Sequence, residues 1–286
     1  MRPHHWAKNL LVFAPAALAH QLDNPFVLWW SFLAFLAFNL TASATYLVND
    51  LVDMESDRKH PVKRNRPLAA GLLKPGHALA AIPVLLALAM SLAFLTPRPG
   101  WFLAALGVYL VLGQTYVFYL KRKLLVDVLA LAALHVLRII AGNAATGIEL
   151  SSWLLAFAMF LFFSLAILKR YSELRDRGDD VGLRVVGRGY LPGDLETLSQ
   201  LGMSSALTSV VIVALYVNSQ KVQELYSRPE LIWLVCPVVL YVLARIWVLA
   251  RRGHVADDPV VFIIRDWRSQ LIALVCAAII FAARFV

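Results

Sequence analysis

The sequence predicts an all-α polytopic membrane protein with nine transmembrane helices. Of the 286 residues, 60% are hydrophobic and only 16% are charged, whereas a soluble domain usually has about 25% charged residues. The apolar residues also gather into runs close to the roughly 20 residues that a helix needs to cross a hydrocarbon core of about 30 Å. We therefore expect a single transmembrane domain over residues 1–286.

Nine apolar runs follow one another along the chain. The first, 9–22, is short and contains Pro15, so its length suits a tilted or interfacial segment better than a full span. The segment has no small-residue cleavage site like that of a signal peptide, and we expect it to be retained. The other eight runs cover 26–48, 76–96, 100–119, 124–146, 152–168, 195–218, 230–250 and 268–285.

Lys and Arg residues gather on one side of the predicted membrane. Two of the 27 lie within spans, and 21 share the side of the N-terminus and of the loops after the second, fourth, sixth and eighth spans. Because Lys and Arg are retained in the cytoplasm, we predict a multi-pass protein of the bacterial inner membrane with a cytoplasmic N-terminus. The remaining four residues lie on the opposite side: Arg98, Lys221, Arg228 and Arg284.

Several classes of function find no support in the sequence. No aromatic-interleaved basic segment or nucleic-acid fold accompanies the basic face, so we expect no nucleic-acid partner. Cys236 and Cys276 lie inside apolar runs without metal-ligand spacing, and no Gly-rich phosphate loop is present. A lipid carrier or flippase with an acidic ion site stays open, although the clustering of charge on one surface favours an interfacial enzyme.

Acidic residues follow the second apolar run in the pattern N-D-x-x-D-x-x-x-D. On a helix with 100° per residue, the three aspartates differ by only about 60°, so all can face one cavity with the asparagine nearby. Like charges this close need a cation to neutralise them. Oxygen ligands favour Mg²⁺, which proteins usually hold together with substrate phosphates. The motif therefore predicts a metal-bound diphosphate on Asn49, Asp50, Asp53 and Asp57.

A basic loop follows the acidic motif directly. Its side chains can bind the phosphate oxygens that a metal leaves exposed. The alternative is an ordinary solvated helix end, in which the acids pair with Arg58, Lys59 and Lys63. The candidate phosphate-binding residues of this loop are Lys59, His60, Lys63, Arg64 and Arg66.

A second polar cluster ends the sixth apolar run. Lys169, Glu173 and Asp176 share one helical face, with Arg170 and Tyr171 adjacent. An isolated Lys–Glu pair would be a minor helix salt bridge, worth a few tenths of a kcal/mol. Beside the first motif, the cluster is interpreted as the opposite wall of one site.

Arg138 is ionisable inside an apolar run and is therefore a functional candidate. A buried structural ion pair is the alternative. Small residues follow it, including Gly142 and Gly147, which favour close helix packing or an opening for a lipid. We expect His135, one turn earlier, to be a hydrogen-bonded interior group.

These motifs resemble the UbiA superfamily of intramembrane prenyltransferases. The specific match is the segment from Asn49 to Asp57. Members that prenylate aromatic acceptors carry a second D-x-x-x-D motif, whereas residues 169–173 of this chain read K-R-Y-S-E. The resemblance implies nine helices, a cytoplasmic active site and diphosphate bound through Mg²⁺.

Within the superfamily, the chain is most similar to the branch of decaprenyl-phosphate phosphoribosyltransferases. The likeness rests on R-P-x-x-W-x-K-N from Arg2, H-P-x-K-R-x-R-P from His60, K-R-Y-x-E-L from Lys169, R-x-I-A-G from Arg138 and I-R-D from Ile264. The superfamily's Tyr/Lys motif stays open in register, because Tyr119 to Lys123 fits Y-x-x-x-K whereas Tyr116 to Lys121 is one residue too long.

This branch implies transfer of 5-phosphoribose from phosphoribosyl diphosphate to a polyprenyl phosphate, for lipid-linked pentose in envelope polymers such as arabinogalactan. The acids, with Glu173, would hold Mg²⁺. Arg138 or Lys121 would orient the lipid phosphate. The alternative is prenyl transfer to an aromatic or other small acceptor, and a homo-oligomer also stays open. The remaining expected substrate-binding residues are Lys8, Lys59, His60, Lys63, Arg64, Arg66, Lys169, Arg170, Tyr171 and Arg265.

Overall fold

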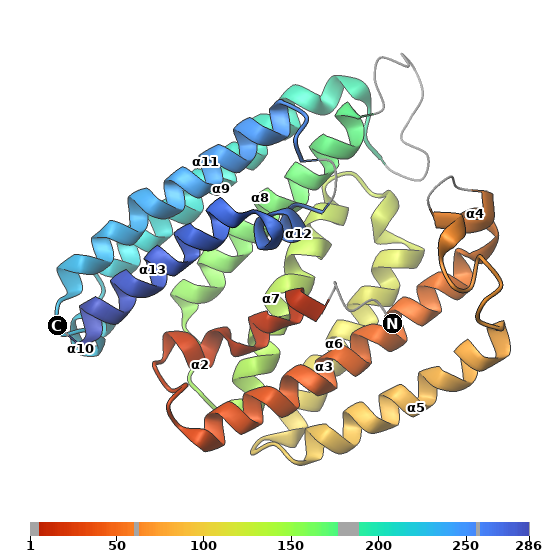
Figure 1. The fold of residues 1–286 in the computed structure, drawn as a ribbon, viewed down its shortest axis with the longest axis horizontal. Coiled ribbons are helices and arrows are strands. Elements are labelled where there is room, and N and C mark those ends of the chain that lie inside the picture. Colours follow the sequence, from red (N-terminus) through yellow and green to blue (C-terminus); the bar gives the residue numbers. More distant parts are fainter. Residues whose placement is uncertain (1–5, 60–62, 177–188, 256–257, 286) are drawn as a thin grey trace. The chain divides into compact units, whose positions relative to one another are not determined.

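The computed structural model describes residues 6–59, 63–176, 189–255 and 258–285, and Figure 1 shows the order of their helices. Eight helical segments among these residues are long and apolar enough to cross a membrane. They contain α3 (Pro25–Val52), α5 (Pro75–Phe94), α6 (Pro99–Phe118), α7 (Val126–Thr146), α8 (Ser152–Arg175), α9 (Leu195–Val217), α11 (Val235–Arg251) and α13 (Trp267–Phe285). The all-helical membrane fold is thus confirmed.

The first predicted span is the exception. Residues 9–22 contain most of a 3₁₀ helix, η1 (Ala7–Phe13), and the short helix α2 (Ala14–Leu18), which are seven and five residues long. At the rise of these helices the segment reaches roughly 20 Å, which is short of a hydrocarbon core of about 30 Å. The described part of the chain therefore has eight full-length candidates, one fewer than predicted.

Prolines and polar caps set where the long helices begin. Pro25, Pro75 and Pro99 open α3, α5 and α6, where a missing N–H costs no intrahelical bond. The Asn24 side chain accepts hydrogen bonds from the backbone N–H groups of Phe26 (3.0 Å) and Val27 (3.4 Å). These caps satisfy donors at helix ends that would otherwise have no partner.

Shorter helical segments connect the long helices in the described part of the chain. Two of them, α4 (Met54–Lys59) and η2 (Lys63–Asn65), follow α3 and carry the acidic and basic motifs. The others are η3 (Leu120–Arg122), α10 (Gln220–Leu225) and α12 (Pro259–Arg265), and the 3₁₀ turns η4 (Pro192–Asp194) and η5 (Pro229–Leu234) lead into α9 and α11.

The chain forms two compact units. Unit 1 comprises residues 1–119 and 137–150, and unit 2 comprises residues 120–136 and 151–286. In unit 1, α3 packs along α5 and also contacts α6 and η1. In unit 2, α8 packs along α9, and α11 contacts both. The helix α7 begins in unit 2 and ends in unit 1.

Two consecutive hydrogen bonds inside unit 2 connect the helices α8, α9 and α11. The indole N–H of Trp247 donates to Ser164 Oγ (3.0 Å), and this hydroxyl donates to the carbonyl oxygen of Gly202 (2.7 Å). A Cβ at Gly202 would lie 2.1 Å from the Trp247 ring. The glycine therefore makes room for the ring, and α8, α9 and α11 are fixed against one another.

Candidate functional site

The acidic motif lies where α3 ends and α4 begins. Asn49 and Asp50 are in the last turn of α3, Asp53 is its C-cap, and Asp57 is on α4. The predicted helix is therefore interrupted at Asp53. Its hydrogen bonding nevertheless continues, because the Asp53 N–H donates to the Asn49 carbonyl (2.9 Å) and the Asp57 N–H to the Asp53 carbonyl (2.8 Å).

Arg66 of the basic loop forms hydrogen bonds with two aspartates of this motif. Its Nη1 donates to Asp57 Oδ2 (2.5 Å) and to Asp50 Oδ1 (3.3 Å). The Asp57 side chain is only 4% exposed. The pairing of acids with a nearby base was expected as the alternative to a metal site, but the base is Arg66 and the pair is partly buried.

The other predicted residues of the basic loop differ in exposure. Lys59 and Arg64 are exposed. For Lys63 the structure describes the backbone in η2, and His60 lies outside the described residues. The loop thus presents two cations to solvent and uses a third, Arg66, against the acids.

Oxygen donors at the motif suit a hard divalent cation. The buried Asn49 Oδ1 has no hydrogen-bond partner in the structure. Such an atom is costly unless a ligand satisfies it, and carboxylates with an amide oxygen are the donors that Mg²⁺ prefers. Across the described ranges no three His, Cys, Asp or Glu side chains are arranged around a metal position. The donor chemistry therefore fits Mg²⁺, while Arg66 serves as the cation for two of the acids.

Arg138 lies in a buried polar cluster of unit 1, and its role as a functional residue stays a prediction. Its Nε donates to Asn9 Oδ1 (2.8 Å) and its Nη2 to the Tyr109 hydroxyl (3.3 Å). The guanidinium also lies 5.5 Å from the centre of the Phe38 ring, where a cation is attracted to the π face. The predicted residue Lys8 is likewise buried.

The same cluster fixes two asparagine orientations. Arginine can only donate, so Asn9 must present its oxygen to Arg138 and its amide nitrogen to Asn39 Oδ1, at 2.6 Å. A Cβ at Gly142, one turn after Arg138, would lie 2.0 Å from the Val12 carbonyl oxygen. The sequence had left open close helix packing or an opening for a lipid, and at Gly142 the structure shows close packing against η1.

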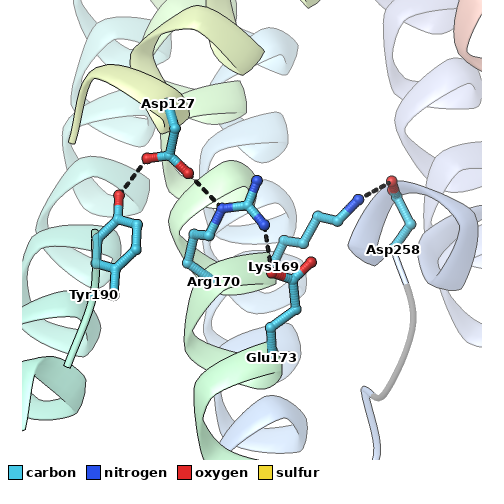
Figure 2. A network of polar contacts seen from close by, with 6 residues as sticks. All are labelled: Asp127, Lys169, Arg170, Glu173, Tyr190 and Asp258. Carbon is cyan, nitrogen blue, oxygen red and sulfur yellow. Dashed lines mark hydrogen bonds and ion pairs between the residues drawn. The ribbon is translucent and has the colours of Figure 1, made fainter. Parts of the chain in front are cut away.

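At the end of α8 in unit 2, bases of the helix pair with acids of α8 and of other segments (Figure 2). Lys169 Nζ pairs with Asp258 Oδ2 at 3.2 Å rather than with Glu173. Arg170 Nε donates to Asp127 Oδ2 at 2.6 Å, and its Nη1 pairs with Glu173. The Lys169 and Glu173 side chains are 33% and 32% exposed, whereas that of Arg170 is 2% exposed.

Two other residues that were predicted to belong to this cluster, Tyr171 and Asp176, contact different partners. Tyr171 packs edge-on against Trp247, with ring centres 5.9 Å apart. Asp176 pairs with its neighbour Arg175 and is exposed. Neither residue joins the network of Figure 2.

Asp127 was missed by the sequence analysis. It is completely buried in the first turn of α7, where it accepts hydrogen bonds from Arg170 and from the Tyr190 hydroxyl (2.5 Å). The rule that selected Arg138, an ionisable residue in an apolar run, applies equally to Asp127. Tyr190 gave no such signal, because it follows a polar loop.

A second missed ion pair joins α11 to the segment before α13. Arg245 donates to both carboxylate oxygens of Asp266, at 2.6 and 3.1 Å. This pairing lowers the pKa of Asp266 from 3.8 to about 2. The predicted Arg265 of the same I-R-D segment is exposed at the end of α12.

The Tyr/Lys motif lies around η3. Tyr119 is exposed at the end of α6, whereas Lys121 is half-buried within η3. Lys123 follows η3 and is exposed. Each of the three has an interaction with another residue, and the register of the motif remains a prediction.

Comparison with known proteins identifies the family. The model of the UbiA prenyltransferase family matches residues 10–269. The chain belongs to this family. Decaprenyl-phosphate phosphoribosyltransferase of Mycobacterium tuberculosis is 32% identical over 290 residues, which cover 99% of this chain and 92% of the relative. Protein y4nM of Sinorhizobium fredii is 38% identical over 284 residues, and this chain spans only 55% of its length.

The fold is also found among solved structures. A UbiA homolog from Archaeoglobus fulgidus, bound to DMAPP and Mg²⁺, superposes with a TM-score of 0.69 and 19% identity, covering 99% of this chain and 96% of that one. The chain is therefore an integral membrane enzyme of the UbiA prenyltransferase family, as its motifs predicted.

Proposed function

We propose that the chain transfers 5-phosphoribose from phosphoribosyl diphosphate to a polyprenyl phosphate and releases diphosphate. The observation that supports this most directly is the likeness, over 99% of the chain, to decaprenyl-phosphate phosphoribosyltransferase. The K-R-Y-S-E segment at residues 169–173, where aromatic prenyltransferases have a second acidic motif, favours the same donor. The product would serve lipid-linked pentose synthesis for envelope polysaccharides such as arabinogalactan.

Asn49, Asp50 and Asp53 are proposed to hold Mg²⁺ against the diphosphate. Asn49 offers an unpartnered oxygen, and the Asp50–Arg66 contact of 3.3 Å is the looser of the two made by Arg66. Mg²⁺ would neutralise the diphosphate and make it a better leaving group. The tighter partner, Asp57, would mainly hold Arg66 and thereby the basic loop near the acids.

The phosphate oxygens of the donor need cations that solvent can reach. Lys59 and Arg64 are exposed in unit 1, and Lys169 is one-third exposed in unit 2. Arg170 is instead buried between two acids, so we assign it to the interior of the protein rather than to the substrate. Lys169 would bind the 5-phosphate after release from Asp258.

The chain's carboxylates would assist the substitution at C1 of the ribose. The bond from C1 to the diphosphate oxygen breaks while an oxygen of the lipid phosphate forms a bond to C1, and inversion is expected. Positive charge develops on the ring, where fixed carboxylates stabilise it. The lipid phosphate is already anionic at neutral pH, so no strong general base is needed. Arg138 or Lys121 would orient it.

The charge distribution supports a cytoplasmic site. Nineteen of the 27 Lys and Arg residues lie in or at the ends of the loops after the apolar runs 26–48, 100–119, 152–168 and 230–250, on the side of the acidic motif, which would be the cytoplasmic side by the positive-inside rule. The soluble donor would enter from the cytoplasm, and the polyprenyl chain would stay in the bilayer of the bacterial inner membrane. Holding both in one enzyme replaces an interfacial encounter by a positioned one.

Release of diphosphate tests the proposal against prenyl transfer. The purified full chain in lipid vesicles is supplied with phosphoribosyl diphosphate and a polyprenyl phosphate, or with a prenyl diphosphate and 4-hydroxybenzoate. We expect diphosphate only from the first mixture, and only with Mg²⁺. Release from the second mixture alone would establish a prenyltransferase and reject the proposal.

A further inference from the structure

Arg66 divides one donor group between two acids that differ in burial. Its Nη1 lies 2.5 Å from Asp57 Oδ2 and 3.3 Å from Asp50 Oδ1, and the two acidic side chains are 4% and 14% exposed. A buried carboxylate needs one cation, and Arg66 supplies it to Asp57. The longer contact, to Asp50, is not needed for that purpose and brings the guanidinium to the oxygens that are proposed to bind metal.

The backbone at Arg66 is held in place, so the side chain has to respond to any ligand. The Arg66 carbonyl oxygen accepts a hydrogen bond from the Ala70 N–H (2.7 Å). Leu68 is buried, and η2, which precedes Arg66, contacts α4. The Arg66 side chain itself is 25% exposed. It can therefore turn away from Asp50 while Asp57 keeps it beside the motif.

The two cations that Asp50 can bind repel each other. Mg²⁺ on Asp50 would lie next to the Arg66 guanidinium, which is protonated at all physiological pH values. Like charges at such short range repel strongly where water is partly excluded. The contact between Arg66 and Asp50 therefore weakens the binding of Mg²⁺ by itself.

A diphosphate reverses the sign of this interaction. It carries more negative charge than one Mg²⁺ ion neutralises, so the complex of the two is an anion. Guanidinium groups attract phosphate oxygens and form strong charge-assisted hydrogen bonds with them. The same side chain thus disfavours the metal alone and favours the metal–diphosphate complex.

We propose that Arg66 is a specificity-determining residue that makes the acidic motif bind Mg²⁺ together with diphosphate in preference to Mg²⁺ alone. In this arrangement Asp57 anchors the guanidinium and is not a metal ligand. The inference rests on the assignment of Asn49, Asp50 and Asp53 to Mg²⁺ in the proposed function. It gives a role to the second contact of Arg66, which the burial of Asp57 does not require.

Mg²⁺ titrations of the full chain in detergent test the inference, with binding measured as the rise in melting temperature. Each variant is titrated without and with a fixed concentration of inorganic diphosphate. The quantity compared is the ratio of the two Mg²⁺ midpoints, which needs no turnover. Arg66→Gln should lower the midpoint for Mg²⁺ alone, and the ratio should fall about 10-fold, as expected for the loss of one charge-assisted hydrogen bond.

Arg58→Gln is the matched control. It removes the same charge one residue from Asp57, but the Arg58 side chain is exposed and its Nη2 contacts Met54 Sδ (3.8 Å). Salt screens the field of such an exposed charge. This variant should therefore leave the ratio close to that of the wild type, which separates a general loss of positive charge from the loss of Arg66.

A double variant tests the part assigned to Asp57. Asp57→Asn removes the anchor and should let Arg66 move fully onto Asp50, which raises the midpoint for Mg²⁺ alone. In Arg66→Gln/Asp57→Asn no guanidinium is left to move, so the midpoint should equal that of Arg66→Gln. A double variant that binds Mg²⁺ more weakly than Arg66→Gln would make Asp57 a metal ligand and reject the inference.

A ratio in Arg66→Gln equal to that of Arg58→Gln would overturn the inference and leave Arg66 a structural link between the loop and α4. The double variant leaves no unpaired buried charge, so it takes the place of Arg66→Gln in this comparison where the single variant does not fold. A wild-type chain without any Mg²⁺-dependent shift rejects the metal assignment and the inference together. A wild-type chain that shows both shifts but makes no phosphoribosyl lipid rejects phosphoribosyl transfer and leaves the inference standing.

Discussion

Gly142→Ala offers a direct test of how η1 packs against α7. The Cβ of an alanine at 142 would lie 2.0 Å from the Val12 carbonyl oxygen and 2.8 Å from its carbonyl carbon. Both atoms are backbone and cannot rotate away, so η1 has to move by more than 1 Å to reach ordinary contact. The Arg138–Asn9 hydrogen bond of 2.8 Å, one turn away on the same two segments, would stretch with it.

A matched control separates this clash from the general effect of the substitution. A Cβ at Gly107, inside α6, would meet nothing within 4 Å. Gly107→Ala should therefore gain up to about 1 kcal/mol from helix propensity. Overpacking costs about 1–3 kcal/mol, and the depth of this clash places Gly142→Ala toward the upper end of that range.

Thermal unfolding in detergent measures the difference between the two variants. A change of 1 kcal/mol moves the melting temperature by roughly 2–4 °C in chains of 150–250 residues, so we expect Gly142→Ala to melt on the order of 5–10 °C below Gly107→Ala. Equal melting temperatures would refute the close contact between η1 and α7.

Three further predictions concern the acids and bases of the two units. Asp50→Ala and Asp53→Ala should abolish turnover while leaving membrane insertion and melting temperature close to wild type; full activity in either would contradict the metal assignment. Lys169→Ala should raise the KM for phosphoribosyl diphosphate several-fold with little effect on that for the lipid, and the reverse pattern would reassign this base. Because the hydrogen bond from Arg245 lowers the pKa of Asp266 from 3.8 to about 2, the pair should stabilise the fold above about pH 4, by about 2 kcal/mol. This contribution is lost as the pH falls toward 2, so an Asp266→Asn variant that keeps the wild-type acid sensitivity of the melting temperature would argue against it.

Hydropathy predicted the fold well because the bilayer imposes its thickness on each helix. Eight long helices lie where the apolar runs do. The first run differs because its apolar residues, interrupted by Pro15, form a segment too short to span, and Asn9 within it turns inward to Arg138. A hydropathy count cannot distinguish a short span from a segment that packs inside the protein.

The candidate site was predicted in part. Spacing along one helix identified the acids from Asn49 to Asp57 and the Lys169–Glu173 cluster, because residues a turn apart share a face. It could not identify partners from other elements: Asp127 lies 43 residues before Arg170, and Asp266 lies 21 residues after Arg245. Only folding brings these charges together.

The mass of the lipid product tests the central claim most directly. Membranes containing the full chain are incubated with polyprenyl phosphate, phosphoribosyl diphosphate and Mg²⁺, in parallel with Asp50→Ala membranes. We predict a lipid heavier by one phosphoribosyl group that depends on Mg²⁺ and is missing from the variant. An unmodified polyprenyl phosphate, together with prenylation of a small acceptor by the same membranes, would contradict the account.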